Sequence, residues 1–114
     1  MKVILLGDTK TGKTTWVHRL NGNENVAKGT LGFEVHNVYH NGVKYEIWDT
    51  GYGGIRDAYF LGSSCAFIVY TEREQVEKYK KEIVDVMKKE IPYVAFNIHE
   101  LQDIHEPFRI LFGK

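Results

Sequence analysis

Eight residues near the start of the chain have the types and the spacing of a phosphate-binding loop. Residues 7–14 read GDTKTGKT and fit the pattern G-x-x-x-x-G-K-[ST]. In this pattern backbone N–H groups point inward at an anion, and the N-terminus of the following helix adds positive potential. The Lys13 ammonium can reach the outer phosphates of a nucleotide, and the Thr14 hydroxyl can bind Mg²⁺. We therefore expect a nucleotide to be held by Asp8, Thr9, Lys10, Thr11, Gly12, Lys13, Thr14 and Thr15.

The elements that must position this loop can be recognised on both sides of it. Residues 3–6 form an apolar run that predicts a buried strand ending at Gly7. Residues 13–21 have helical spacing and are followed by the helix-stopping sequence 21–23, NGN. A strand before the loop and a helix after it are the context in which the motif binds phosphate. The alternative is a glycine-rich turn between a strand and a helix that holds no ligand.

Turn and strand patterns divide the rest of the chain into alternating elements. Two β-rich runs, 33–39 and 43–48, are joined by Asn41-Gly42, which is typical of a two-residue hairpin. We also expect a loop over 23–31, a short helix around 55–61, strands over 65–70 and 93–96, and helices over 73–90 and 105–112. This order predicts an α/β fold in three layers, with helices on both faces of a mostly parallel sheet. The sheet should have about five strands with one antiparallel hairpin edge strand, in a single domain over residues 1–114.

Four residues follow expected strands and should meet at one edge of this sheet. They are Gly7, Asp49, Thr71 and Asn97. In open parallel sheets ligands bind beyond the carboxyl ends of the strands. The sequence therefore predicts one nucleotide site at this edge.

Composition limits the classes of partner. The 114 residues carry 15 Lys and Arg against 15 Asp and Glu, so the formal net charge is zero and a general affinity for nucleic acid is not expected. No signal peptide, membrane-spanning run or lipid-anchor motif is recognised, and the one cysteine, Cys65, fits a reducing compartment. We expect a soluble protein of the cytoplasm or nucleus with no membrane anchor. The five histidines show no zinc spacing, and His36 and His40 would lie ~13 Å apart along a strand.

Three further segments carry a recognisable pattern. Residues 28–36 read KGTLGFEVH, residues 48–51 read WDTG, and residues 53–60 read GGIRDAYF. Together with the phosphate loop they resemble the Ras superfamily of small GTPases over most of residues 2–97, with Ran as the most similar branch. The first segment resembles switch I of Ran and the strand after it, and the other two resemble its switch II. The resemblance implies a G domain that binds GTP or GDP with Mg²⁺.

The resemblance also assigns roles to individual residues. Thr30 would bind Mg²⁺ beside Thr14 and sense the γ-phosphate, and Asp49 would hold the ion through water. The catalytic residues would then be Lys13 and Thr30. Hard oxygen ligands of this kind suit Mg²⁺. The bland alternative for Thr30 and Asp49 is that each is an ordinary turn residue.

Effector or transport-receptor proteins would dock on the switches of the triphosphate-loaded form. An aromatic surface between the switches in related GTPases corresponds to Phe33, Trp48 and Tyr59, with Arg56 beside it. Strand alternation independently places Trp48 on the same side as the charged Lys44 and Glu46, which favours a partner surface. Ordinary core packing is the alternative for the aromatic residues, and a solvated surface charge is the alternative for Arg56.

Departures from the family pattern predict weak hydrolysis and weak base recognition. Thr9 replaces a glycine of the phosphate loop, and no glutamine corresponds to the one that orients water, so hydrolysis should be slow. The guanine-reading motif Asn-Lys-x-Asp aligns with residues 97–100, which keep Asn97 but have Ile98 for the lysine and Glu100 for the aspartate. After Asp103 the family's next helix, strand and loop are missing, which would leave a sheet edge open to dimerisation.

Two other functions are compatible with the same residues. The first is a pseudo-GTPase that mimics the Ran surface and binds transport receptors without nucleotide, which the degraded base-reading motif favours. The second is a P-loop nucleotide kinase, which lacks support because no arginine-bearing lid segment is recognised.

Overall fold

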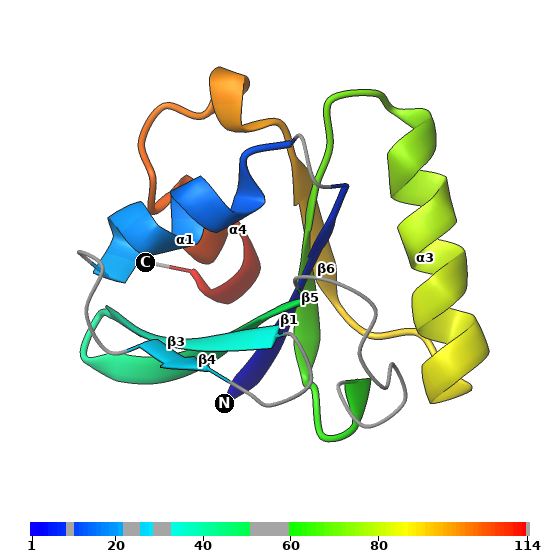
Figure 1. Cartoon of the computed structure of the whole chain (residues 1–114), viewed down its shortest axis with the longest axis horizontal. Helices are drawn as coiled ribbons and strands as arrows, with labels where there is room; N and C mark the ends of the chain where they lie inside the picture. The colour runs from blue at the N-terminus through cyan, green and yellow to red at the C-terminus, as the bar shows by residue number, and fades with distance from the viewer. Residues whose placement is uncertain (9–10, 22–25, 29–32, 51–59, 114) are drawn as a thin grey trace.

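The structure is a computed structural model in which residues 9–10, 22–25, 29–32, 51–59 and 114 are not described. Its elements in chain order are β1 (Lys2–Gly7), α1 (Lys13–Asn21), β2 (Val26–Lys28), β3 (Phe33–His40), β4 (Val43–Thr50), β5 (Cys65–Val69), α3 (Glu74–Met87), β6 (Tyr93–Phe96), the 3₁₀ helix η1 (Ile98–Glu100) and α4 (Glu106–Phe112). One sheet lies between α1 and α4 on one face and α3 on the other (Figure 1). The expected three-layer α/β fold is confirmed.

The sheet has the strand order β2-β3-β4-β1-β5-β6. β1 pairs in parallel with both β4 and β5, and β5 pairs in parallel with β6. The hairpin of β3 and β4 turns at Asn41 and Gly42, whose φ angles of 52° and 80° belong to the turn that matches strand twist. The parallel strands bring their carboxyl ends to one edge, as the sequence predicts.

The edge next to the hairpin differs from the expectation. Residues 23–31 were expected to form a loop, but Val26–Lys28 forms the short strand β2, antiparallel to β3. The pairing joins Val26 to His36 and Lys28 to Glu34. β3 is therefore an inner strand, and β2 is the edge strand on this side in the described part of the chain.

Side chains of β1 alternate between two apolar layers. Val3 and Leu5 contribute to the layer that contains Trp16 of α1 and Phe108 of α4. The Trp16 indole N–H donates to the backbone oxygen of Ile104 at 2.9 Å, so this large side chain is fully buried without an unsatisfied donor. This layer fixes α1, which carries the second half of the phosphate loop.

The second layer packs α3 against the opposite face of the sheet. Ile4 and Leu6 contact the apolar stripe of α3, which includes Tyr79 and Ile83. α3 ends earlier than the expected residue 90, because Lys88 adopts a left-handed conformation (φ 60°) and its N–H bonds to Val84 O at 2.8 Å. The two layers pack against both faces of β1, so the phosphate loop starts from a strand that is buried on both sides.

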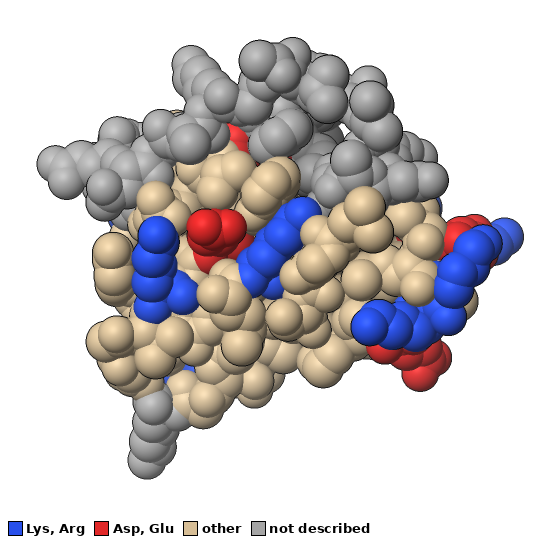
Figure 2. All heavy atoms as spheres, turned by 90° about the horizontal axis from the view of Figure 1, so that it is seen from below, with Lys and Arg blue, Asp and Glu red and all other residues tan. Residues whose placement is uncertain are grey.

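Charged side chains of both signs are interspersed on the face drawn in Figure 2, where blue and red spheres adjoin on the α3 side at the right. This distribution agrees with the formal net charge of zero. On this face and among the described residues, no broad patch of one sign is visible. None of the described helices has the length and apolar character needed to cross a bilayer.

Candidate nucleotide-binding site

The described part of the phosphate loop makes a tight turn between β1 and α1. Thr11 donates its backbone N–H and its hydroxyl to Asp8 O, at 3.2 and 2.8 Å. Gly12 has φ +84°, a conformation that glycine adopts without strain. A Cβ on Gly7 would lie 2.7 Å from Val69 O, so the loop can leave the sheet here only with a glycine. The structure therefore explains why glycine is needed at both positions of the motif, 7 and 12.

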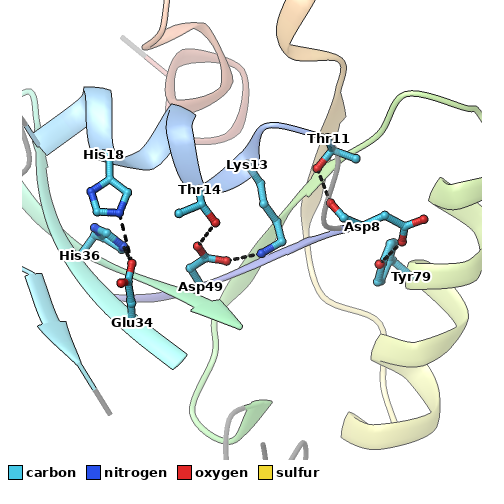
Figure 3. A network of polar contacts seen from close by, with 9 residues as sticks. All are labelled: Asp8, Thr11, Lys13, Thr14, His18, Glu34, His36, Asp49 and Tyr79. Atoms are coloured by element: carbon cyan, nitrogen blue, oxygen red, sulfur yellow. Dashed lines mark hydrogen bonds and ion pairs between the residues drawn. The ribbon is translucent and has the colours of Figure 1, made fainter. Parts of the chain in front are cut away.

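Lys13 and Thr14, the first residues of α1, converge on Asp49 near the end of β4 (Figure 3). The Lys13 ammonium forms an ion pair with Asp49 Oδ1, and the Thr14 hydroxyl donates to Asp49 Oδ2 at 2.7 Å. The Lys13 and Asp49 side chains are only 6% and 3% exposed. The structure thus brings together three predicted site residues, two from the start of α1 and one from β4.

The oxygen atoms around Asp49 fit a magnesium ion. Mg²⁺ prefers hard oxygen ligands and commonly takes one or two protein groups together with phosphate and water. The Thr14 hydroxyl and the Asp49 carboxylate are such groups, and their oxygens are 2.7 Å apart. Thr14 is exposed while Asp49 is buried, so the pair faces solvent from one side only.

Asp8 connects the loop to α3. Its carboxylate accepts hydrogen bonds from Tyr79 Oη, from Gln75 Nε2 at 2.9 Å and from Lys78 Nζ at 3.3 Å. The Tyr79 hydrogen bond, followed by the contributions of Lys78 and Gln75, holds the pKa of Asp8 below its ordinary value, against some desolvation. Sequence reasoning placed Asp8 at the nucleotide. The structure places its side chain on α3, so only its backbone is left for an anion.

Asn97 begins the loop after β6, which contains the residues aligned with the guanine-reading motif. Its Oδ1 accepts the backbone N–H of His99 at 3.0 Å and so caps η1. Ile98 lies close to the loop, since a Cβ on Gly12 would be 3.3 Å from Ile98 Cδ1, and it packs on the apolar layer under α1. Glu100 is exposed. These residues reach the same end of the sheet as the phosphate loop.

The remaining predicted residues divide into two groups. Thr15 is exposed on α1, and Trp48 is half-buried: it packs against the layer under α3, with the Lys2 ammonium 3.8 Å from the centre of its ring. The other predicted residues lie outside the described residues or, for Phe33, have a side chain that is not described: Thr9, Lys10, Thr30, Phe33, Arg56 and Tyr59.

A cluster that sequence spacing missed lies beside the site. His18 of α1 and His36 of β3 both contact the carboxylate of Glu34, at 3.3 and 3.0 Å (Figure 3). Glu34 and His36 lie two residues apart on β3, and His18 joins them only because α1 packs on β3. The spacing of the histidines along the chain therefore does not reveal the cluster.

The fold and the site define a class of protein. An α/β G domain has a P-loop with its Lys and Thr after a β-strand, and an aspartate at the end of a neighbouring parallel strand. This chain has the same arrangement. A family model described as "Roc: Ras of Complex, Roc, domain of DAPkinase" matches residues 2–99, and the chain belongs to this family of Ras-like GTPase domains. The protein is accordingly a GTP-binding switch protein by family. The resemblance to the Ras superfamily is confirmed, whereas the match does not confirm the Ran branch.

Proposed function

We propose that this chain binds GTP and GDP together with Mg²⁺ at the edge formed by Gly7, Asp49 and Asn97, and that it hydrolyses GTP slowly. One observation carries the proposal: Lys13, Thr14 and Asp49 converge at the start of α1. Their chemistry is that of a site for phosphate and a hard cation. Membership of the Roc family supports guanine as the base.

The residues of the proposed site have separate tasks. Backbone N–H groups of the loop and of the first turn of α1 hold the phosphate oxygens. The Lys13 ammonium would leave Asp49 and bind the outer phosphates, and Asp49 would hold the cation through water. Thr14 and Thr30 would provide hydroxyl oxygens to that cation, and Lys13 and Thr30 would contact the γ-phosphate. Bound Mg²⁺ would neutralise charge that develops on the phosphates.

The number and the contacts of the glutamines support slow hydrolysis. The chain has Gln75 and Gln102 and no other glutamine. Gln75 accepts the backbone N–H groups of Thr71 and Glu72 and donates to Asp8, so both ends of its amide are engaged. Without a glutamine to orient the attacking water, most of the activation available to this class is lost, on the order of 10⁵-fold in favourable cases.

Partner binding is the finer part of the proposal. The sequence of residues 28–36 supports a Ran-like effector surface that receives transport receptors or other effectors in the cytoplasm or nucleus. The half-buried Trp48 would supply apolar area at the rim of this effector surface.

A dimer is also part of the proposal. At the edge of the sheet opposite β2, β6 pairs only with β5 among the described strands, which supports a dimer formed through that edge.

A second function has one observation in its favour. The Lys13 ammonium is already neutralised by Asp49, and the loop is closed by hydrogen bonds of its own. A chain with these contacts can present its surface to partners without any nucleotide, as a pseudo-GTPase would.

Calorimetric titration of the nucleotide-free chain distinguishes the two functions. A non-hydrolysable GTP analogue, GDP and an ATP analogue are each titrated with Mg²⁺, and Lys13→Ala serves as the matched control. GTP-analogue binding that Lys13→Ala abolishes, while circular dichroism shows that the variant is still folded, supports the switch. Equal binding of the ATP analogue would overturn guanine selectivity, and no heat with any nucleotide would leave the pseudo-GTPase.

A further inference from the structure

Three side chains on α1 and β3 form a compact cluster of metal-ligand type. His18 lies on α1, and Glu34 and His36 lie on β3 (Figure 3). Glu34 Oε1 is 3.3 Å from His18 Nε2 and 3.0 Å from His36 Nε2, and the ligand atoms all lie within 4.8 Å of one another. The two imidazole rings meet edge to face with centroids 4.8 Å apart.

We propose that His18, Glu34 and His36 bind one divalent transition-metal ion of the Zn²⁺ class, at a site separate from the Mg²⁺ site at Thr14 and Asp49. Two imidazole nitrogens and one carboxylate oxygen are a common zinc ligand set, with a fourth position left to water. A tetrahedral ion with ligands at 2.0–2.1 Å separates neighbouring ligand atoms by about 3.3 Å. The two distances to Glu34, 3.3 and 3.0 Å, are close to this separation.

The burial of the three residues suits an ion that enters from solvent. The His36 side chain is fully buried, whereas His18 and Glu34 are 30% and 27% exposed. His36 is therefore a fixed ligand, whereas the partly exposed His18 can adjust to an ion that enters from solvent.

The cluster also differs from the other histidines of the chain. His40 and His105 stack with ring centroids 5.9 Å apart, but His40 Nε2 is 3.2 Å from Gly113 O. The carboxylate close to that pair, Asp103, forms an ion pair with Arg109. Within the described ranges, the His18 cluster is the one group of three or more candidate ligands with its atoms gathered in this way.

A bound ion would connect α1 to β3. α1 starts with the phosphate-binding Lys13 and Thr14, and β3 starts three residues after Thr30. The ion would therefore fix the distance between the phosphate loop and the strand that follows switch I. This consequence rests on the geometry of the cluster and does not need nucleotide to be bound.

Zinc titration of the full chain tests the proposal. Calorimetry is carried out with Zn²⁺ in a large excess of Mg²⁺, which competes for oxygen sites such as the proposed one at Asp49, and Co²⁺ absorption reports tetrahedral coordination. We expect one Zn²⁺ per chain, and His18→Asn and Glu34→Gln should each weaken its affinity at least about tenfold. His99→Gln and His105→Gln are matched controls that should bind as the unmodified chain does.

The variants are chosen so that loss of folding is not mistaken for loss of a ligand. His18 and Glu34 are partly exposed, and circular dichroism of each variant checks that the fold is kept. Unchanged zinc affinity in both His18→Asn and Glu34→Gln would overturn the proposal. Loss of binding in His105→Gln alone would overturn it too, by placing the ion at the other histidine pair.

Discussion

The Lys13 ammonium and the Asp49 carboxylate form a buried ion pair that connects the first residue of α1 to β4. The side-chain exposures are 6% and 3%, so each charge is compensated by its partner and not by bulk water. The Thr14 hydroxyl bonds the second carboxylate oxygen, so both oxygens of Asp49 are satisfied. In the proposed function the nucleotide phosphates compete with Asp49 for the same ammonium.

Breaking this pair from one side should destabilise the fold. Lys13→Met leaves the buried Asp49 carboxylate uncompensated, and we expect a loss of about 3–5 kcal/mol in the free energy of unfolding. The double variant with Asp49→Asn should be more stable than the sum of the single losses predicts, with a coupling of about 0.5–3 kcal/mol. Urea unfolding measures all four proteins. Strictly additive losses would show that the two groups do not interact in solution.

Gly7→Ala tests the steric reason for the first glycine of the motif. Its Cβ would lie 2.7 Å from Val69 O, a backbone atom that cannot move aside, so we expect a loss of about 1–3 kcal/mol and weaker nucleotide binding. Gly62→Ala is the matched control. Gly62 has φ +78° with nothing within 4 Å, so its variant should lose about 1 kcal/mol and keep its nucleotide affinity. Equal nucleotide affinity in both variants would contradict the steric explanation.

Much of the fold could be predicted from local patterns. The strand at residues 93–96, the hairpin at Asn41-Gly42 and the helix over 13–21 are found where hydrophobic spacing and turn residues indicate them. Their local sequences and their tertiary surroundings favour the same structure. β2 was missed because three residues carry too little periodicity, and its pairing with β3 is a long-range contact.

The site could be predicted only where a motif fixes it. Lys13, Thr14 and Asp49 converge as the family pattern implies. The contacts of Asp8 with α3 and the grouping of His18 with Glu34 and His36 could not be foreseen, because they depend on how helices pack on the sheet. Nothing in the spacing of residues along the chain encodes that packing.

Tyr79→Phe should change the acid dependence of stability through Asp8. The Tyr79 hydrogen bond lowers the pKa of Asp8 from 3.8, so its stabilising effect is present above that value and is lost as the pH falls through the lower folded-state pKa. We expect the Asp8 pKa to move up towards 3.8 in Tyr79→Phe, as followed by NMR titration of the carboxyl carbon. Tyr39→Phe, at a side chain that is 61% exposed, should leave it unchanged.

Restoring the family's base-reading residues should raise guanine selectivity. In the proposed function, Ile98→Lys with Glu100→Asp supplies the contacts that residues 97–100 lack, and each buried hydrogen bond regained is equivalent to about 1–3 kcal/mol. We expect the ratio of GTP-analogue to ATP-analogue affinity to rise at least about tenfold, as measured by calorimetry. Glu100→Asp alone is the control. An unchanged ratio in the double variant would place the base elsewhere.

Cys65 should be unreactive in the folded protein. Burial raises the pKa of its thiol to about 11, so at pH 8 on the order of one thiol in a thousand is ionised. Disulfide-exchange reagents should therefore modify it at least about 100-fold more slowly in buffer than in urea. Since the neutral thiol is favoured by the fold, stability should fall as the pH rises above 9. Equal labelling rates in buffer and urea would show that β5 opens readily.

The pairing of β2 with β3 ends two residues before Thr30 in the sequence, because Lys28 pairs with Glu34. In the proposed function, a nucleotide-dependent change at Thr30 would act on the end of this short ladder. Loss of its three strand pairs would then accompany one of the two nucleotide states. The amide protons of residues 26–28 would exchange with solvent faster in one nucleotide state than in the other.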